Sequence, residues 1–416
     1  TRRDRQLLET CVPIPVKNLI LSWRTIALSL LLSLAAGFSS ITEPVDRIIE
    51  AAIGRLAWRA VSGDIVVVAL DEKTLAKYGK DDFSMRRHAE VVDAINHAGA
   101  KRLFIDFTYE RRQNDPDLAL LTSAVKRWQN RVVLAASAKN AKGGQAELTN
   151  LPGPAFGGQA LIACIGWQYE FWQVWRIPIT LEVDGKPVPS FSSVLAHRPS
   201  DKGGVYALDY SYRTDTIPYV SAADVLSGQA GRRELAGKDV VFAPTAATFQ
   251  DSHYLPGSDR VPGAFIHVVG AETLKRGMPI DIGWLPGLLF AGIVLLASMA
   301  FRRARWFNAA AIATVGIMIF SKIVLTTILV STSIGAGLFL VATIGANVSR
   351  TNRRHSAQRE NPVSGLPNFE ALRSQASFSS ATVVAAKVVN FEDLAAFIPG
   401  DGISRLVEQV TRRLQL

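Results

Sequence analysis

The sequence has little cysteine and little charge. Two cysteines, Cys11 and Cys164, occur among 416 residues, which is too few for a disulfide framework or a cysteine-based zinc site. Charged residues make up 20% of the chain, whereas a soluble domain carries about 25%. The mean hydropathy is positive, at +0.17. These shortages exclude a disulfide scaffold, give no redox or metal role, and predict segments that lie in a membrane.

The excess of basic residues has a membrane explanation. The formal net charge is +10, which a nucleic-acid-binding protein can also show. Here the arginines lie beside apolar runs and not on one amphipathic helix face. We therefore expect no nucleic acid as a partner. The length allows two folded units with linking segments.

Four apolar stretches are long enough to cross a bilayer as helices. They are residues 25–41, 282–300, 307–324 and 331–348. Basic residues precede the first stretch, separate the second from the third, and follow the fourth: Arg2, Arg3, Arg5, Lys17 and Arg24, then Arg302, Arg303 and Arg305, then Arg350, Arg353 and Arg354. The positive-inside rule places all three groups in the cytoplasm.

This topology makes residues 1–24 a cytoplasmic amino terminus, residues 42–281 an extracytoplasmic domain, and residues 349–361 a cytoplasmic linker in a multi-pass protein of the bacterial inner membrane. Lys322 is the one charge between residues 307 and 348, and at 1.5 Å per residue it lies about 22 Å along its helix, so it reaches the outer surface. Alternatively, the first stretch is a cleaved signal peptide, which also leaves the next domain outside.

The extracytoplasmic segment has the pattern of an α/β domain. A β-branched run at 64–70, a helical repeat from His88 to Ala98 and a second strand at 103–107 form a βαβ unit. A helix at 116–128 and a strand at 132–136 repeat the pattern, which predicts a mostly parallel sheet. The later part is mixed: strands around Asp184-Gly185 form a hairpin, 238–243 is a late core strand, and 262–275 is a helix.

Several motifs in this order resemble the type-two CHASE family of extracellular sensor domains. They are DIVVVALDEKTL at 64–75, HAEVVDAINHAGAKRLFIDF at 88–107, PSFSSVLA at 189–196, LAGKDVVFAPTA at 235–246 and VPGAFIHVVGAETLKRG at 261–277. Together with the three later apolar stretches, the resemblance covers residues 42–348. Ala243-Pro244 departs from the family pattern, which reshapes the loop after that strand.

Ligands of open parallel sheets bind beyond the carboxyl ends of the strands. The candidate sensing residues there are Asp71, Glu72, Asp106, Asp251 and His253. The alternative is that these carboxylates only cap helices and fix loops. His267 fits a core histidine, and Trp167, Trp172 and Trp175 fit packing better than stacking. No catalytic residue and no metal site are predicted.

The end of the chain resembles a second family. NPVSGLPN at 361–368 is similar to the opening of GGDEF domains, which make cyclic di-GMP. Residues 362–416 would then begin an α+β GGDEF-like domain that is incomplete at Leu416, so we expect the chain to be a fragment.

The GGDEF resemblance fails at the positions that carry its chemistry. Lys387 and Val389 stand where the family has magnesium-binding aspartates, and Ala395, Ala396 and Ser404 stand where it has substrate contacts. An ammonium cannot ligate a hard divalent cation. We therefore expect no cofactor in this chain and a catalytically inactive domain.

The sequence predicts a transmembrane receptor that senses an unknown extracytoplasmic ligand and regulates cyclic di-GMP turnover. Degenerate GGDEF domains commonly precede an EAL phosphodiesterase, which would need magnesium and would lie beyond residue 416. The alternatives are an active diguanylate cyclase and a non-enzymatic nucleotide-binding or scaffolding receptor. Small residues along the last span, from Gly335 to Ala346, favour a homodimer in the lipid bilayer or packing within one subunit.

Overall fold

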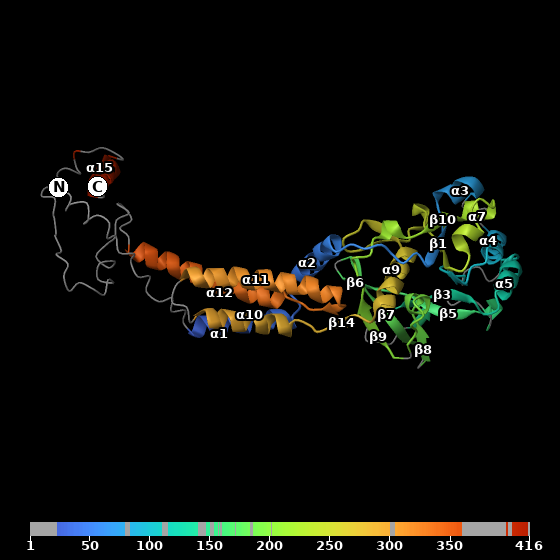
Figure 1. The fold of residues 1–416 in the computed structure, drawn as a ribbon, viewed down its shortest axis with the longest axis horizontal. Helices are drawn as coiled ribbons and strands as arrows, with labels where there is room; N and C mark the ends of the chain where they lie inside the picture. Colours follow the sequence, from blue (N-terminus) through green and yellow to red (C-terminus); the bar gives the residue numbers. More distant parts are fainter. Residues whose placement is uncertain are drawn as a thin grey trace. The chain divides into compact units, whose positions relative to one another are not determined.

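A computed structural model describes residues 23–79, 84–109, 115–139, 147–149, 154–156, 158, 160–170, 172–183, 186–200, 202–299, 304–359, 397 and 402–414 (Figure 1). The chain divides into two compact units. The α/β unit comprises Glu43–Gly283 and Ser321–Ser333, and the helical unit takes the rest. The α/β unit is therefore made from two separate stretches of the chain.

The α/β unit is built on a parallel sheet. Its strand order is β10 (Tyr219–Ser221), β1 (Ile65–Leu70), β11 (Asp239–Pro244), β2 (Arg102–Ile105), β3 (Val132–Lys139) and β5 (Leu161–Ile165). All these pairs are parallel, and β4 (Glu147–Thr149) joins β3 antiparallel. The predicted strands at 64–70, 103–107, 132–136 and 238–243 are confirmed, and the last of them, β11, lies between β1 and β2.

Helices cover one face of this sheet. They are α3 (Glu72–Tyr78), α4 (Met85–His97), α5 (Leu118–Lys126), α7 (Ala222–Leu226) and α8 (Arg232–Leu235). Val66, Val68 and Leu70 of β1 pack into the core that α4 and α5 share. The chain turns back after α4 at Gly99, whose φ of +82° is left-handed and suits glycine.

The opposite face of the sheet has its own core. Ile65 and Val67 of β1 pack there with side chains of α6 (Phe191–Leu195) and α9 (Gly263–Arg276). Because successive strand residues alternate between the faces, the uninterrupted apolar run of β1 is explained by burial on both sides.

A second sheet accounts for the mixed pattern of the later sequence. Its long strand β7 (Gln173–Val183) pairs antiparallel with β6 (Gln168–Glu170), β8 (Lys186–Pro189) and β9 (Gly204–Ala207). β12 (Ser252–Tyr254) joins β7 parallel and β13 (Arg260–Pro262) antiparallel. The predicted hairpin is confirmed by the pairing of β7 with β8, while its turn residues Asp184 and Gly185 lie outside the described residues.

Three elements complete the α/β unit. They are α2 (Glu43–Leu56), the short pair β14 (Ile280–Asp281) and β15 (Val330–Ser331), and the end of α11 from Ser321 to Thr327. Single 3-10 turns occur at Pro154–Phe156, Thr214–Thr216 and Ala247–Phe249. The segment 321–333, which was predicted to lie in or beside the third and fourth spans, groups with this folded unit by its contacts.

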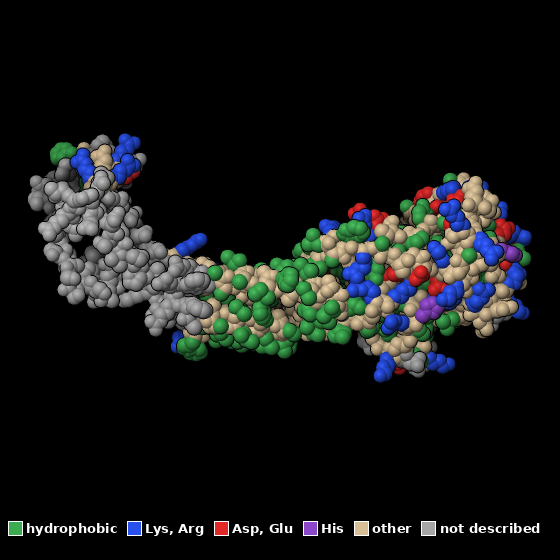
Figure 2. Space-filling model, in the orientation of Figure 1, with side chains coloured by type: hydrophobic (Ala, Val, Ile, Leu, Met, Phe, Trp, Pro, Cys, Tyr) green, Lys and Arg blue, Asp and Glu red, His purple; other side chains and the backbone are tan. Residues whose placement is uncertain are grey.

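The helical unit contains α1 (Trp23–Phe38), α10 (Leu285–Met299), the first part of α11 (Ala304–Thr327) and α12 (Gly335–Arg359). Figure 2 shows mostly hydrophobic side chains on the visible face of α1, α10 and α11. The rings of Phe38 and Trp284 meet edge to face at 5.0 Å. A Cβ on Gly337 would lie 2.7 Å from the Gly287 carbonyl oxygen, so this glycine packs within the chain. Helix α15 (Gly402–Leu414) lies further on.

Candidate functional site

A cavity of about 610 Å³ lies at the carboxyl ends of the parallel strands. Five neighbouring strands each contribute one wall residue at or near their carboxyl end. They are Leu70 of β1, Asp106 after β2, Ser137 of β3, Ile165 of β5 and Pro244 of β11. This is where open parallel sheets bind ligands, since the loops diverge there. Pro244, part of the departure from the family pattern, is one of the wall residues.

Asp106 and Asp251 both line this cavity, and their carboxyl groups interact electrostatically. Asp106 is 7% exposed, and burial, reinforced by the negative charge of Asp251, raises the pKa of its carboxyl to about 8. A carboxyl with a pKa of about 8 is mostly protonated at neutral pH.

Asp251 is held at the start of helix α9. Its carboxylate accepts a hydrogen bond from His253 Nε2 at 2.9 Å, and His253 Nδ1 lies 2.6 Å from the Tyr169 hydroxyl. A Cβ on Gly263 would lie 2.8 Å from Asp251 Oδ2, so only glycine lets the helix begin so close to the carboxylate. A helix amino terminus favours a negative charge, so this position suits a carboxylate.

His267 is the deepest polar residue of the wall. It is 1% exposed, its Nδ1 lies 3.2 Å from Ser192 Oγ, and its Nε2 is buried with no hydrogen-bond partner. Burial lowers the pKa of its imidazole to about 4, so the ring is neutral at physiological pH. The ring of Trp167 lies 4.6 Å from that of His253 and 5.3 Å from that of His267.

The structure separates the five candidate residues into two groups. Asp106, Asp251 and His253 line the cavity. Asp71 instead caps α3, accepting from the Thr74 amide at 2.9 Å and from the Ser221 hydroxyl at 2.7 Å. Glu72 accepts from the amide of Ala247 at 2.9 Å. Asp71 and Glu72 therefore have the contacts expected of carboxylates that cap a helix or fix a loop, which was the alternative to a sensing role.

Other wall residues were not singled out from the sequence: Met85, His88, Phe107, Thr108, Tyr109 and Phe249. His88 Nδ1 lies 3.0 Å from the Tyr109 hydroxyl. His88 was read only as part of the helical repeat of α4. The sequence places His88 on the apolar face of this helix, and a buried imidazole needs a polar partner. That position could have indicated that His88 lies beside a polar site.

Comparison with known proteins identifies the fold's family. Residues 25–300 match the family model of the CHASE2 domain. The chain belongs to the CHASE2 domain family. CHASE2 is an extracellular sensor domain of signalling receptors, so the α/β unit has a sensing role. No curated protein and no solved structure matches the chain.

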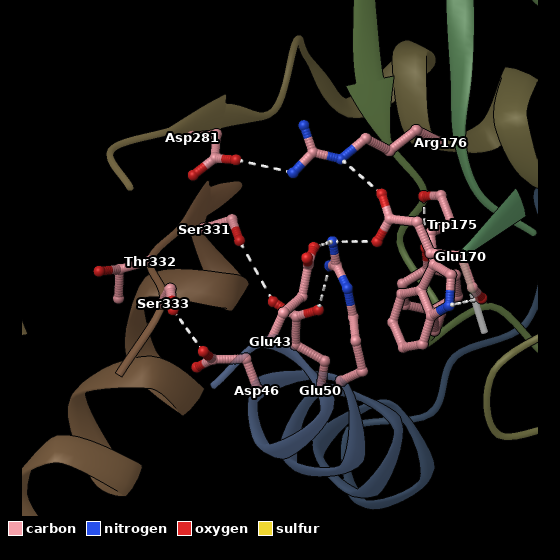
Figure 3. Close-up of polar contacts among 12 residues, drawn as sticks. Glu43, Asp46, Glu50, Glu170, Trp175, Arg176, Asp281, Ser331, Thr332 and Ser333 are labelled. Carbon is pink, nitrogen blue, oxygen red and sulfur yellow. Dashed lines mark hydrogen bonds and ion pairs between the residues drawn. The ribbon is translucent and has the colours of Figure 1, made fainter. Parts of the chain in front are cut away.

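A charged cluster occupies another part of the CHASE2 α/β unit (Figure 3). Arg47 of α2 bonds Glu43 and Glu50 at 2.8 Å each, pairs with Glu170, and lies 4.6 Å from the centre of the Trp175 ring. Burial raises the pKa of the Glu170 carboxyl despite the charge of Arg47. The cluster thus joins α2 to β6 and β7.

Arg176 extends the cluster from β7 to β14. Its guanidinium pairs with Asp281 at 3.0 Å and with Glu170 at 3.7 Å. Asp281 lies two residues before Gly283, where the first stretch of the α/β unit ends. The pair therefore ties the sensor's second sheet to the point where the chain leaves this unit.

Lys322 brings the returning segment into the same cluster. Its ammonium is 3.0 Å from Glu50, 3.7 Å from Asp46 and 2.6 Å from the Thr332 carbonyl oxygen. Its side chain is 2% exposed, so it is not at a lipid surface. Ser333 also donates to Asp46. The expectation that Lys322 reaches the outer side agrees with its position in the sensor unit, but a buried ion cluster holds it there.

The described residues contain one helix that is long and apolar enough to cross a membrane, Phe307–Thr327. The bent pair Trp23–Phe38 and Glu43–Leu56, with 69° between its helices, makes a second if it is one span, and Leu285–Ser298 is a shorter apolar helix. Helices thus occur at all four predicted stretches, and four crossings stay a prediction.

The GGDEF-like segment is mostly outside the described residues, including Lys387, Val389, Ala395 and Ala396. Ser404 lies in helix α15. In the described part of the chain, no group of three or more His, Cys, Asp or Glu side chains is arranged to hold a metal ion. Cys164 is buried as a free thiol, and Cys11 lies outside the described residues.

Proposed function

We propose that this chain is the input half of a transmembrane receptor, in which a ligand of the CHASE2 cavity sets the activity of a cytoplasmic cyclic di-GMP enzyme. Four spans would carry the signal to the segment from residue 349. The degenerate GGDEF-like segment would regulate an EAL phosphodiesterase beyond residue 416. The observation that carries the sensing step is the cavity with its paired acids at the strand ends.

The charged cluster supplies a route from the sensor unit to the spans. Chain segments leave or enter the α/β unit at Glu43, Gly283, Ser321 and Ser333. The cluster contacts all four of these regions through Arg47, Asp281, Lys322 and Asp46. A ligand that moves β7 relative to α2 would therefore act on the ends of every predicted span.

Filling the cavity tests the sensing step. Ile165 lines the cavity at one end of β5, and Leu161 is 47% exposed at the other end of the same strand. In cells that produce the whole parent protein and a cyclic di-GMP reporter, Ile165→Trp should change the reporter level. Leu161→Trp should leave it as in the wild type. Equal reporter levels for all three proteins, at equal membrane abundance, would contradict sensing by this cavity.

A second experiment separates the proposed output from an active cyclase. Purified parent protein should convert no GTP to cyclic di-GMP in the presence of magnesium, because Lys387 replaces a family magnesium ligand. It should instead degrade cyclic di-GMP if an EAL domain follows. Cyclic di-GMP synthesis that disappears in Lys387→Ala would show that the lysine belongs to a working cyclase.

A further inference from the structure

The charge around the CHASE2 cavity is acidic. Its described wall contains two carboxyl groups, Asp106 and Asp251, and three imidazoles, but no lysine and no arginine. Of the imidazoles, His253 already contacts Asp251 and Tyr169, and His88 contacts Tyr109. An anionic ligand would therefore meet Asp251 with no cationic side chain of the described wall to compensate it.

A buried polar atom in the wall lacks its partner. Nε2 of His267 has no hydrogen bond, although the residue is 1% exposed. His267 lines the cavity, and in the tautomer that carries its proton on Nδ1 and donates to Ser192 Oγ, the Nε2 lone pair has no partner. An unpaired buried acceptor costs about 1–3 kcal/mol, so a ligand that brings an N–H donor to this atom gains affinity.

The rest of the wall is suited to an apolar body. Aromatic rings of Phe107, Tyr109, Trp167 and Phe249 and the side chains of Leu70, Met85 and Ile165 line it. Rings of this kind attract an organic cation through their π faces and bury its hydrocarbon. A bare metal ion does not fit this wall, since the described residues form no metal-holding group.

We propose that the CHASE2 cavity binds a small organic amine as its ammonium ion, with Asp106 and Asp251 as counter-ions and His267 Nε2 as a hydrogen-bond acceptor. Binding would favour release of the Asp106 proton to solvent, because a cation beside the carboxylate offsets both the cost of its burial and the neighbouring charge of Asp251. This inference rests on the proposed sensing function and names the ligand class of the same cavity.

Three probes of similar shape test the charge that the cavity requires. They are 2-phenylethylamine, 2-phenylethanol and 3-phenylpropionate, titrated calorimetrically into the full chain in lipid nanodiscs at pH 7. A hydrogen bond to a charged group contributes about 1.5–3 kcal/mol, so the amine should bind at least about tenfold more tightly than the alcohol. The carboxylate should bind more weakly than either.

Two further measurements tie the amine to the named residues. In Asp106→Asn the affinity for the amine should fall at least about tenfold, while that for the alcohol stays the same. Asp215→Asn, at an exposed aspartate paired with Arg213, should change neither affinity. Titrations of the wild type in buffers of different ionisation enthalpy should show net proton release on amine binding.

The outcomes separate the two proposals. Equal or tighter binding of the alcohol or the carboxylate would overturn the ammonium assignment and leave sensing by the cavity intact. Absence of binding for all three probes would also overturn it, while the Ile165→Trp reporter experiment tests sensing on its own. Amine binding that survives Asp106→Asn without loss and without proton release would place the amine elsewhere.

Discussion

Replacing Asp106 by asparagine should stabilise the folded chain more as the pH rises. Asparagine has nearly the same shape and cannot ionise. Asp106 has an ordinary pKa of 3.8 and a pKa of about 8 in the folded protein. The folded state thus holds a proton that the unfolded state has released, so stability is fully present below pH 3.8, falls as the pH rises, and levels off above about pH 8.

The size of the effect follows from proton linkage. One proton held only by the folded state lowers the free energy of unfolding by about 1.4 kcal/mol per pH unit. Between pH 5 and pH 7 the wild type should therefore lose about 2–3 kcal/mol relative to Asp106→Asn. The side chain is 7% exposed, so solvent screening removes little of this difference.

Urea unfolding of the full chain in detergent, followed by tryptophan fluorescence at pH 5, 6 and 7, measures this difference directly. Asp215→Asn is the matched control. Its hydrogen bond with Arg213 lowers the pKa of the Asp215 carboxyl, so this group is ionised in both states over the same range and adds no pH dependence. Difference infrared spectra should also show a protonated carboxyl band at pH 6 that Asp106→Asn lacks. A gap between wild type and Asp106→Asn that is constant with pH would refute the argument.

Three other predictions concern the rest of the chain. Lys322→Met should destabilise the protein by about 3–5 kcal/mol because it removes a buried cation from between Asp46 and Glu50, and adding Glu50→Gln should recover part of the loss in thermal unfolding of the full chain. Cys164, whose thiol has its pKa raised by burial to about 12, should resist iodoacetamide at pH 8 until the chain is unfolded, as mass spectrometry can show; rapid labelling of the folded protein would contradict its burial. If α12 forms the homodimer that its small residues predict, Gly345→Cys should crosslink in membranes, since space around Gly345 is open, and Gly337→Cys should not, since Gly337 packs within the chain; the reverse pattern would exclude this interface.

The sequence predicted the parallel sheet and the strand-end position of Asp106 because local patterns specify both. Alternation, β-branched runs and the rule for open sheets need no knowledge of distant contacts. It did not predict which strand-end acids reach the cavity. Asp71 precedes a helix, and its carboxylate accepts hydrogen bonds from Thr74 and Ser221. Ser221 lies 150 residues away in the sequence.

The histidines and the ion cluster show the same limit. His267 was expected in a core, and it is buried, but its orphan Nε2 becomes visible only when Ser192 and the cavity are placed around it. Lys322 was assigned to the end of a span from its position along one helix. Its partners on α2 lie some 270 residues earlier in the chain, and no periodicity indicates such a pairing.

The two-part composition of the α/β unit has a consequence for biogenesis. Residues 321–333 add strand β15, the Lys322 ammonium and the Ser333 hydroxyl to a body that otherwise ends at Gly283. During synthesis residues 43–283 are made first, and residues 321–333 are made only after α10 and most of α11. The α/β unit cannot be complete before then. If α10 and α11 are the predicted spans, completion of the sensor would require both of them to be inserted in the predicted orientation. A chain in which those helices were misplaced would lack the Lys322 ammonium beside Asp46 and Glu50, and its α/β unit would stay incomplete.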